Sequence, residues 1–179
     1  MIGFVFSLLA LASSPPAVSD TIRAEAESAE AFYDEHGIRP LRDDGVRALA
    51  FNTEWVDDPY RVEGDFNDDD TGDVVVIGTR AGALWLVWCL SEPRQFRCEA
   101  VSFADEQDVT LAWPRGTYQT RHTVHLRIPS EEEKEFAKDF SVAGRIAFAL
   151  EFGDATSSGG QVYAVVEGRL VPAFPFSVN

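Results

Sequence analysis

The apolar side chains of this chain recur mostly as unbroken runs or with the two-residue period of β-strands. The clearest run is the β-branched stretch 74–77, which reads as a buried strand. Glycine-containing turns separate several of these segments. Strands are predicted over residues 73–79, 83–90, 96–103, 108–113, 121–128 and 145–152, with shorter strand or turn material at 46–52 and a final hairpin, 161–167 with 169–176, about Gly168.

Two segments have a helical pattern instead. From Asp20 to about His36, small and apolar residues recur at spacings of three and four, and Gly37 can end the helix. Ser130 and Glu133 form a capping box that predicts a short helix near 131–140. The predicted fold class is therefore α+β: mainly antiparallel β-sheet with an N-terminal helix and a short second helix.

The segment 83–103 predicts a hairpin with a defined register. A loop at 92–95 places Cys89 directly opposite Cys98, and puts Leu84 and Leu86 opposite Phe103 and Val101 on the other face. In an oxidising compartment two cysteines placed in this way should form a disulfide. The alternative, a pair of buried thiols, applies if the protein is not exported.

The first 19 residues carry no charged side chain and contain a short apolar stretch at 2–12. Ala17 and Ser19 supply small residues at the −3 and −1 positions of a cleavage site before Asp20. We therefore expect residues 1–19 to be a signal peptide and the protein to be secreted or periplasmic. A buried N-terminal strand or a membrane anchor is the alternative. The mature chain, residues 20–179, is then a single β-rich domain without a membrane span.

The charge of the 179-residue chain is −15 and is unevenly distributed. Residues 20–73 carry 17 acidic and 5 basic side chains, and residues 74–179 carry 13 and 10. Nucleic acid and anionic membrane surfaces require basic patches and are therefore poor candidates as partners. A cation, or a protein or glycan partner in the cell envelope, fits this charge better.

The acidic residues are densest at 65–73, where five aspartates fall within nine residues. Calcium takes six to eight oxygen ligands in flexible geometry, and side-chain oxygens at alternate loop positions can supply them. Like charges packed this closely repel one another unless a cation is present. The loop therefore predicts a calcium site with these ligands: the side chains of Asp65, Asn67, Asp69 and Asp73, and the main-chain carbonyl of Thr71.

A helix–loop–helix calcium site fits this loop badly. Its twelfth position would be Val76, where that motif needs a bidentate Glu, and a strand pattern follows. The pattern D-x-N-x-D-x-x-x-D followed by a strand instead resembles the calcium loop of FG-GAP and VCBS-type repeats. That resemblance implies the same ligands. The family usually has Gly where this chain has Asp68 and Asp70, and the simpler alternative is a solvated acidic turn.

A looser resemblance runs along the mature chain. The acidic loop, the motif P-x-G-T-Y-x-T at 114–120 and the motif Y-x-V-x-x-G-R-L at 163–170 look like the layout of small exported bacterial proteins with no assigned activity. No nucleophile elbow, phosphate loop or thiolate zinc site is present in the sequence, and no catalytic residue is assigned. The expected function is an exported, calcium-stabilised binding or structural domain. The alternative is a small secreted hydrolase or an envelope enzyme inhibitor.

Overall fold

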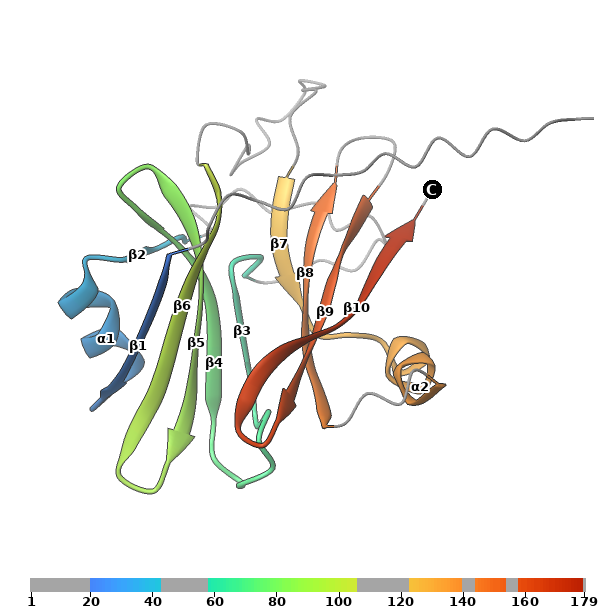
Figure 1. Cartoon of the computed structure of the whole chain (residues 1–179), viewed down its shortest axis with the longest axis horizontal. Coiled ribbons are helices and arrows are strands. Elements are labelled where there is room, and N and C mark those ends of the chain that lie inside the picture. The colour runs from blue at the N-terminus through green and yellow to red at the C-terminus, as the bar shows by residue number, and fades with distance from the viewer. Residues whose placement is uncertain (1–19, 43–57, 106–122, 140–143, 154–157, 179) are drawn as a thin grey trace, which may run out of the picture.

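The computed structural model describes residues 20–42, 58–105, 123–139, 144–153 and 158–178 (Figure 1). These residues form two antiparallel sheets and two short helices, so the protein is mainly antiparallel β-sheet. In chain order the elements are β1 Thr21–Ala26, α1 Ala29–His36, β2 Arg39–Pro40, β3 Arg61–Gly64, β4 Asp73–Arg80, β5 Ala83–Glu92, β6 Gln95–Asp105, β7 Thr123–Arg127, α2 Glu131–Asp139, β8 Arg145–Gly153, β9 Ser158–Val166 and β10 Arg169–Val178.

The first sheet has the strand order β1-β6-β5-β4-β2, and β3 also pairs with β4. The outer edge of β4 is shared: β2 pairs with its C-terminal end and β3 with its N-terminal end. The second sheet has the order β10-β9-β8-β7. The Leu126 N–H of β7 donates to the carbonyl oxygen of Pro59, just before β3, at 2.6 Å. This bond joins the two sheets along one side.

The main hydrophobic core lies between the two sheets. One face of β4 and β5 contributes side chains such as Val75, Ile77 and Leu86, and the second sheet contributes Leu126 and Phe148. All five are at most 3% exposed. Alternate positions of these strands therefore face this core.

The other face of the first sheet is covered by α1. Its Phe32 and Tyr33 pack there against Val76 and Val87, in a second cluster that also contains the disulfide. The Ser28 side chain caps the start of α1 by accepting the Ala31 N–H at 3.1 Å. The helix thus covers the face of the first sheet that is turned away from the second sheet.

The predicted helix from Asp20 to His36 is wrong in its first half, because Thr21–Ala26 is a strand. The same residues also alternate, with Ile22, Ala24 and Ala26 on the face toward the second cluster. Pairing with β6 satisfies the backbone of this segment and buries that face, which outweighs a weak helical pattern in the sequence.

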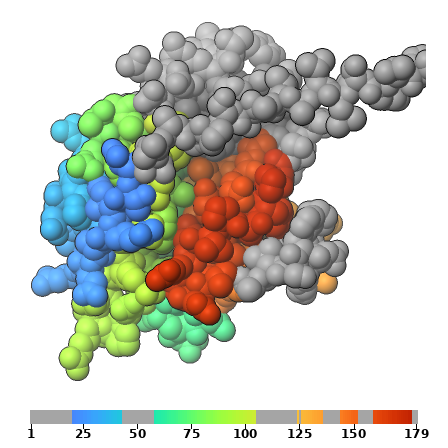
Figure 2. Space-filling model, in the orientation of Figure 1, coloured from blue at the N-terminus to red at the C-terminus, as the bar shows by residue number. Residues whose placement is uncertain are grey.

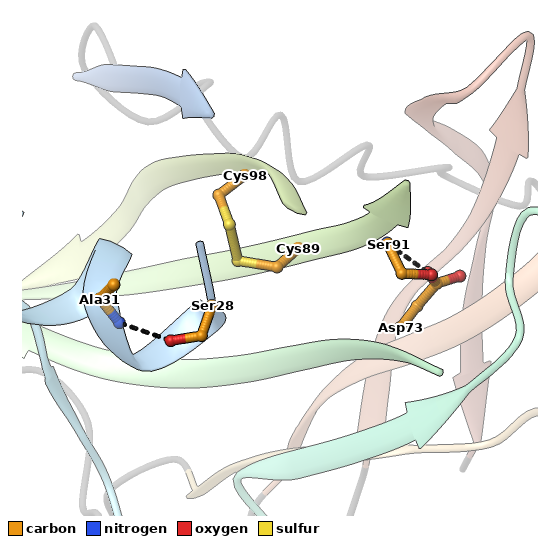
Figure 3. The surroundings of a disulfide bond; sticks show 6 residues. All are labelled: Ser28, Ala31, Asp73, Cys89, Ser91 and Cys98. Carbon is orange, nitrogen blue, oxygen red and sulfur yellow. Dashed lines mark hydrogen bonds between the residues drawn. A yellow bond between two sulfur atoms is a disulfide. The ribbon is translucent and has the colours of Figure 1, made fainter. Parts of the chain in front are cut away.

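The predicted hairpin register is confirmed near the turn and is displaced by one residue farther away. Cys89 pairs with Cys98 and Leu86 with Val101, as expected. A β-bulge between Leu84 and Trp85 moves Leu84 opposite Ala104 instead of Phe103. Cys89 and Cys98 form a disulfide with an S–S distance of 2.08 Å (Figure 3).

The second helix is also confirmed, together with its capping box. The Glu133 N–H donates to Ser130 Oγ at 3.2 Å, and the Ser130 N–H donates to Glu133 Oε2 at 2.8 Å. Both Nη atoms of Arg127 donate to the Glu133 carboxylate at 2.6 Å, and its Nε donates to buried Glu151 at 2.8 Å. The Arg127 guanidinium holds the pKa of Glu133 below its usual range. This half-buried cluster fixes α2 to the second sheet.

Some predictions lie outside the described residues. These are the signal peptide at 1–19, the short strand at 46–52, the strand at 108–113, the motif at 114–120 and the first two residues of the strand at 121–128. Among the residues that the structure describes, no helix is long and apolar enough to cross a membrane.

The disulfide leads to a prediction about stability. The two cysteines are nine residues apart, so the bond should stabilise the fold by about 2–3 kcal/mol in the loop-entropy model. Equilibrium denaturation with and without a reductant should show a loss of that size. The double variant Cys89→Ala/Cys98→Ala is the control and should not respond to the reductant. Identical unfolding curves for the oxidised and reduced wild type would contradict the prediction.

Candidate metal centre

The acidic loop connects β3 to β4 at one end of the sandwich. Phe66 anchors it, since its ring is 5% exposed and lies in the main core with a centroid 6.4 Å from that of Phe148. Gly64 ends β3 and leaves room for this ring, because a Cβ at that position would come within 2.8 Å of it. The polar residues that follow are held at the surface between this anchor and the start of β4.

The loop wraps around the carboxylate of Asp65. Asp65 Oδ1 accepts the N–H groups of Asp68 at 2.7 Å and Asp69 at 3.1 Å, and Oδ2 accepts the Asp70 N–H at 3.2 Å. Three successive backbone donors around one carboxylate form a compact turn and offset part of its charge.

The backbone is left-handed at the two positions where FG-GAP and VCBS-type repeats usually have Gly. Asp68 has φ 66° and Asp70 has φ 61°. Asp tolerates this conformation better than most residues do. The chain therefore keeps the turn that glycines would provide and adds two carboxylates that are exposed to solvent.

Asn67 and Asp69 lie together in the middle of the loop. The Asn67 Nδ2 donates to Asp69 Oδ2 at 3.0 Å and to the Ser91 carbonyl oxygen at 3.2 Å. Thr71 donates its hydroxyl and its N–H to Asp69 Oδ1, and the hydroxyl bond is the main cause that lowers the pKa of Asp69. The Asn67 Oδ1 is withdrawn from solvent and has no hydrogen-bond partner.

Asp73 is the most buried acid of the loop, at 2% exposure. Burial raises the pKa of its carboxyl, and hydrogen bonds from Ser91 and Phe66 oppose that effect. Its Oδ2 accepts the Phe66 N–H at 2.6 Å, and its Oδ1 accepts the Ser91 N–H at 2.7 Å and the Ser91 hydroxyl at 3.0 Å (Figure 3). Asp73 thus ties the loop to the end of β5.

Arg145, at the start of β8, supplies a positive charge to the outside of the loop. Its Nη1 lies 2.5 Å from Asp68 Oδ1 and 3.8 Å from Asp65 Oδ2. A hollow of about 600 Å³ adjoins these residues. Phe66 and Ile128 are among its apolar lining residues, and Ile128 is 48% exposed. The hollow therefore combines charged groups with exposed apolar surface.

The structure brings the predicted ligands into one short loop but directs them to different partners. Asp65 faces backbone N–H groups, Asp69 faces Asn67 and Thr71, and Asp73 faces β5. Within the described parts of the chain, no group of three or more His, Cys, Asp or Glu side chains is arranged to hold a metal ion.

Two residues that contact the loop, Ser91 and Arg145, were not predicted from the sequence. Ser91 could have been found by counting back along the β4–β5 hairpin, since Val74 pairs with Cys89 and so brings Asp73 close to Ser91. Arg145 is 77 residues from Asp68, in the other sheet, and local pattern gives no signal for such a contact.

Comparison of the chain with protein-family models, with curated proteins and with solved structures finds no match.

The backbone at Asp70 generates a prediction that does not depend on a metal ion. Asp70→Gly should leave stability nearly unchanged, because Gly adopts a left-handed conformation without a steric penalty. Asp70→Val should lose about 1–2 kcal/mol, because a β-branched side chain is strained there. Chemical denaturation in the presence of a chelator measures both variants. Equal stability of the two would show that this residue is not left-handed in solution.

Proposed function

We propose that the loop 65–73 binds one calcium ion and that the protein is an exported, calcium-stabilised binding or structural domain. The proposed ligands are those predicted from the sequence: the side chains of Asp65, Asn67, Asp69 and Asp73, and the carbonyl of Thr71. All of them are hard oxygens, the type that calcium prefers.

The main support for this proposal is the environment of the Asn67 amide oxygen. This oxygen is buried and lacks a hydrogen-bond donor, while the nitrogen of the same amide makes two hydrogen bonds. An unsatisfied buried acceptor costs about 1–3 kcal/mol. A cation at the centre of the loop would satisfy it, and neighbouring Asp69 would supply the charge that favours a cation over water.

The loop backbone supports the same conclusion. Its turn around Asp65 and its two left-handed residues already form a tight wrap, so little ordering is needed when an ion binds. Coordination would require Asp65, Asp69 and Asp73 to exchange or share hydrogen bonds that they make now. Such a change is small for exposed Asp69 and larger for buried Asp73.

The position of the loop supports a structural role. It joins β3 to β4, contacts β5 through Ser91 and meets β8 through Arg145. An ion held there would reinforce the end of both sheets. The neighbouring hollow, with exposed Ile128 beside charged residues, is the surface that we assign to a protein or glycan partner in the envelope.

Calcium should stabilise the wild-type fold by about 2.7 kcal/mol at a free concentration one hundred times the dissociation constant. Asp69→Asn should remove most of this gain, because it takes away a ligand charge. Asp70→Asn is the matched control: it removes the same charge from an exposed neighbour and keeps a residue that tolerates the left-handed backbone. Denaturation in calcium and in chelator, together with calorimetric titration, measures the three proteins.

The contrast between the two variants separates coordination from general acidity. If Asp69→Asn and Asp70→Asn lose the same share of the stabilisation by calcium, the effect of calcium depends only on the net charge of the loop. If the wild-type protein unfolds identically in calcium and in chelator, the loop is an ordinary acidic turn and the proposal is wrong.

Export is tested separately. The disulfide is compatible with an oxidising compartment. Protein recovered from the periplasm or the medium should have the intact mass of residues 20–179. Recovery from the cytoplasm with residues 1–19 retained would contradict this part of the proposal and leave the calcium site unaffected.

A further inference from the structure

Strand β1 is the last strand on one side of the first sheet, and its outer edge is exposed. Within the described residues, β6 is the strand that pairs with it. The space-filling view shows the blue residues of β1 on the surface beside yellow-green β6 (Figure 2). Such an edge presents backbone donors and acceptors that another strand can use.

The pairing with β6 fixes which backbone groups are available. The Ser102 N–H donates to the Asp20 carbonyl oxygen at 3.1 Å, so residue 20 directs its backbone groups toward β6. Backbone direction alternates along an antiparallel strand, and the register of β1 contains no bulge. Thr21, Arg23 and Glu25 therefore direct their N–H and C=O groups outward.

The side chains of β1 separate by face. Thr21, Arg23 and Glu25 are exposed, whereas Ile22, Ala24 and Ala26 pack toward the second cluster. On the exposed face, Arg23 lies opposite Glu99 with an ion pair of 2.8 Å, and Glu25 lies opposite Arg97. Each charged side chain on this face of β1 therefore lies opposite a side chain of opposite charge on β6.

We propose that two copies of this chain associate edge to edge through β1, antiparallel, about a two-fold axis at Ala24. In this register Arg23 of each copy lies opposite Glu25 of the second copy. The same two residues carry the outward backbone groups, so both charge pairs fall at hydrogen-bonded positions of the new ladder.

Other registers are less favourable. A two-fold axis perpendicular to the sheet keeps each face on its own side, so residues opposite one another must belong to the same face. This is possible only if one residue lies opposite its own copy at the axis. An axis at Arg23 or at Glu25 sets that residue against its own copy, which is repulsive. An axis at Ile22 shortens the overlap and leaves Glu25 unpaired. Only the axis at Ala24 gives two attractive charge pairs.

Both faces of the joined sheet are complementary in this register. The charged face continues an alternating row across four strands, from Glu99 through Arg23 to Glu25 and Arg97 of the second copy. The apolar face places Ile22 opposite Ala26 of the second copy. Each chain carries a net charge of −15, so association requires local complementarity of this kind.

Sedimentation velocity over a concentration series up to about 0.2 mM tests the proposal. The wild type should form a dimer. Arg23→Glu and Glu25→Arg should each weaken self-association about tenfold or more, because each places two like-charged pairs across the axis. An equimolar mixture of the two variants should dimerise again, since an all-acidic strand then meets an all-basic strand. Arg39→Glu, on the opposite edge of the same sheet, is the control and should dimerise like the wild type.

A backbone variant gives a second test. Arg23→Pro removes an N–H that points away from β6, so the monomer should fold and the dimer should be lost. A wild type that remains monomeric throughout the series would overturn the proposal and leave β1 as a short, charged edge that protects against aggregation. A mixture of the two charge variants that stays monomeric would overturn it as well, as would dimerisation of Arg23→Pro.

Discussion

The structure depends on the burial of the β4–β5 hairpin on both of its faces. The second sheet covers one face, including Val75 and Ile77, and α1 covers the other, including Val76 and Val87. Each fully buried aliphatic side chain of this kind contributes roughly 1.5–3 kcal/mol. With both faces apolar, a one-residue slip would exchange the faces without exposing them, so burial alone specifies the register weakly. Polar contacts at the end of the two strands must supply the rest, and the Asp73–Ser91 contact joins β4 to β5 there. The disulfide fixes the neighbouring pair, β5 and β6.

The parts of the fold that could be predicted from the sequence are those that local sequence patterns determine. The unbroken apolar run 74–77 and the turn at 92–95 fix two strands and the pairing of Cys89 with Cys98, because these signals are local and strong. The capping box of α2 is equally local. The helix predicted for residues 20–28 was wrong because the apolar residues there fit both the helical period of about 3.6 and the strand period of two. Pairing with β6, whose residues lie 70 to 80 positions farther along the chain, decides between them, and no local pattern contains that information.

The same distinction applies to the candidate site. The loop and its tight turn could be predicted, since acidic spacing is visible in nine residues. The hydrogen bonds that occupy each carboxylate could not, because they depend on Ser91 and Arg145, which the fold brings in from β5 and β8. Asp68 and Asp70 adopt a left-handed backbone that usually favours Gly, and their carboxylates lie in solvent, where Arg145 meets that of Asp68.

These contacts also determine how an ion in the loop would affect the whole protein. Asp73 is buried, begins β4 and accepts a hydrogen bond from the backbone of β5. A calcium ion bound by Asp73 would therefore be attached directly to the β4–β5 hairpin. Asp69 is exposed and accepts hydrogen bonds from its loop neighbours Asn67 and Thr71 and from Ser91. Calcium held by Asp69 alone would stiffen the loop and change local hydrogen exchange. Calcium shared with Asp73 would raise the free energy of global unfolding, because the loop could then open only when the end of the β4–β5 hairpin separates.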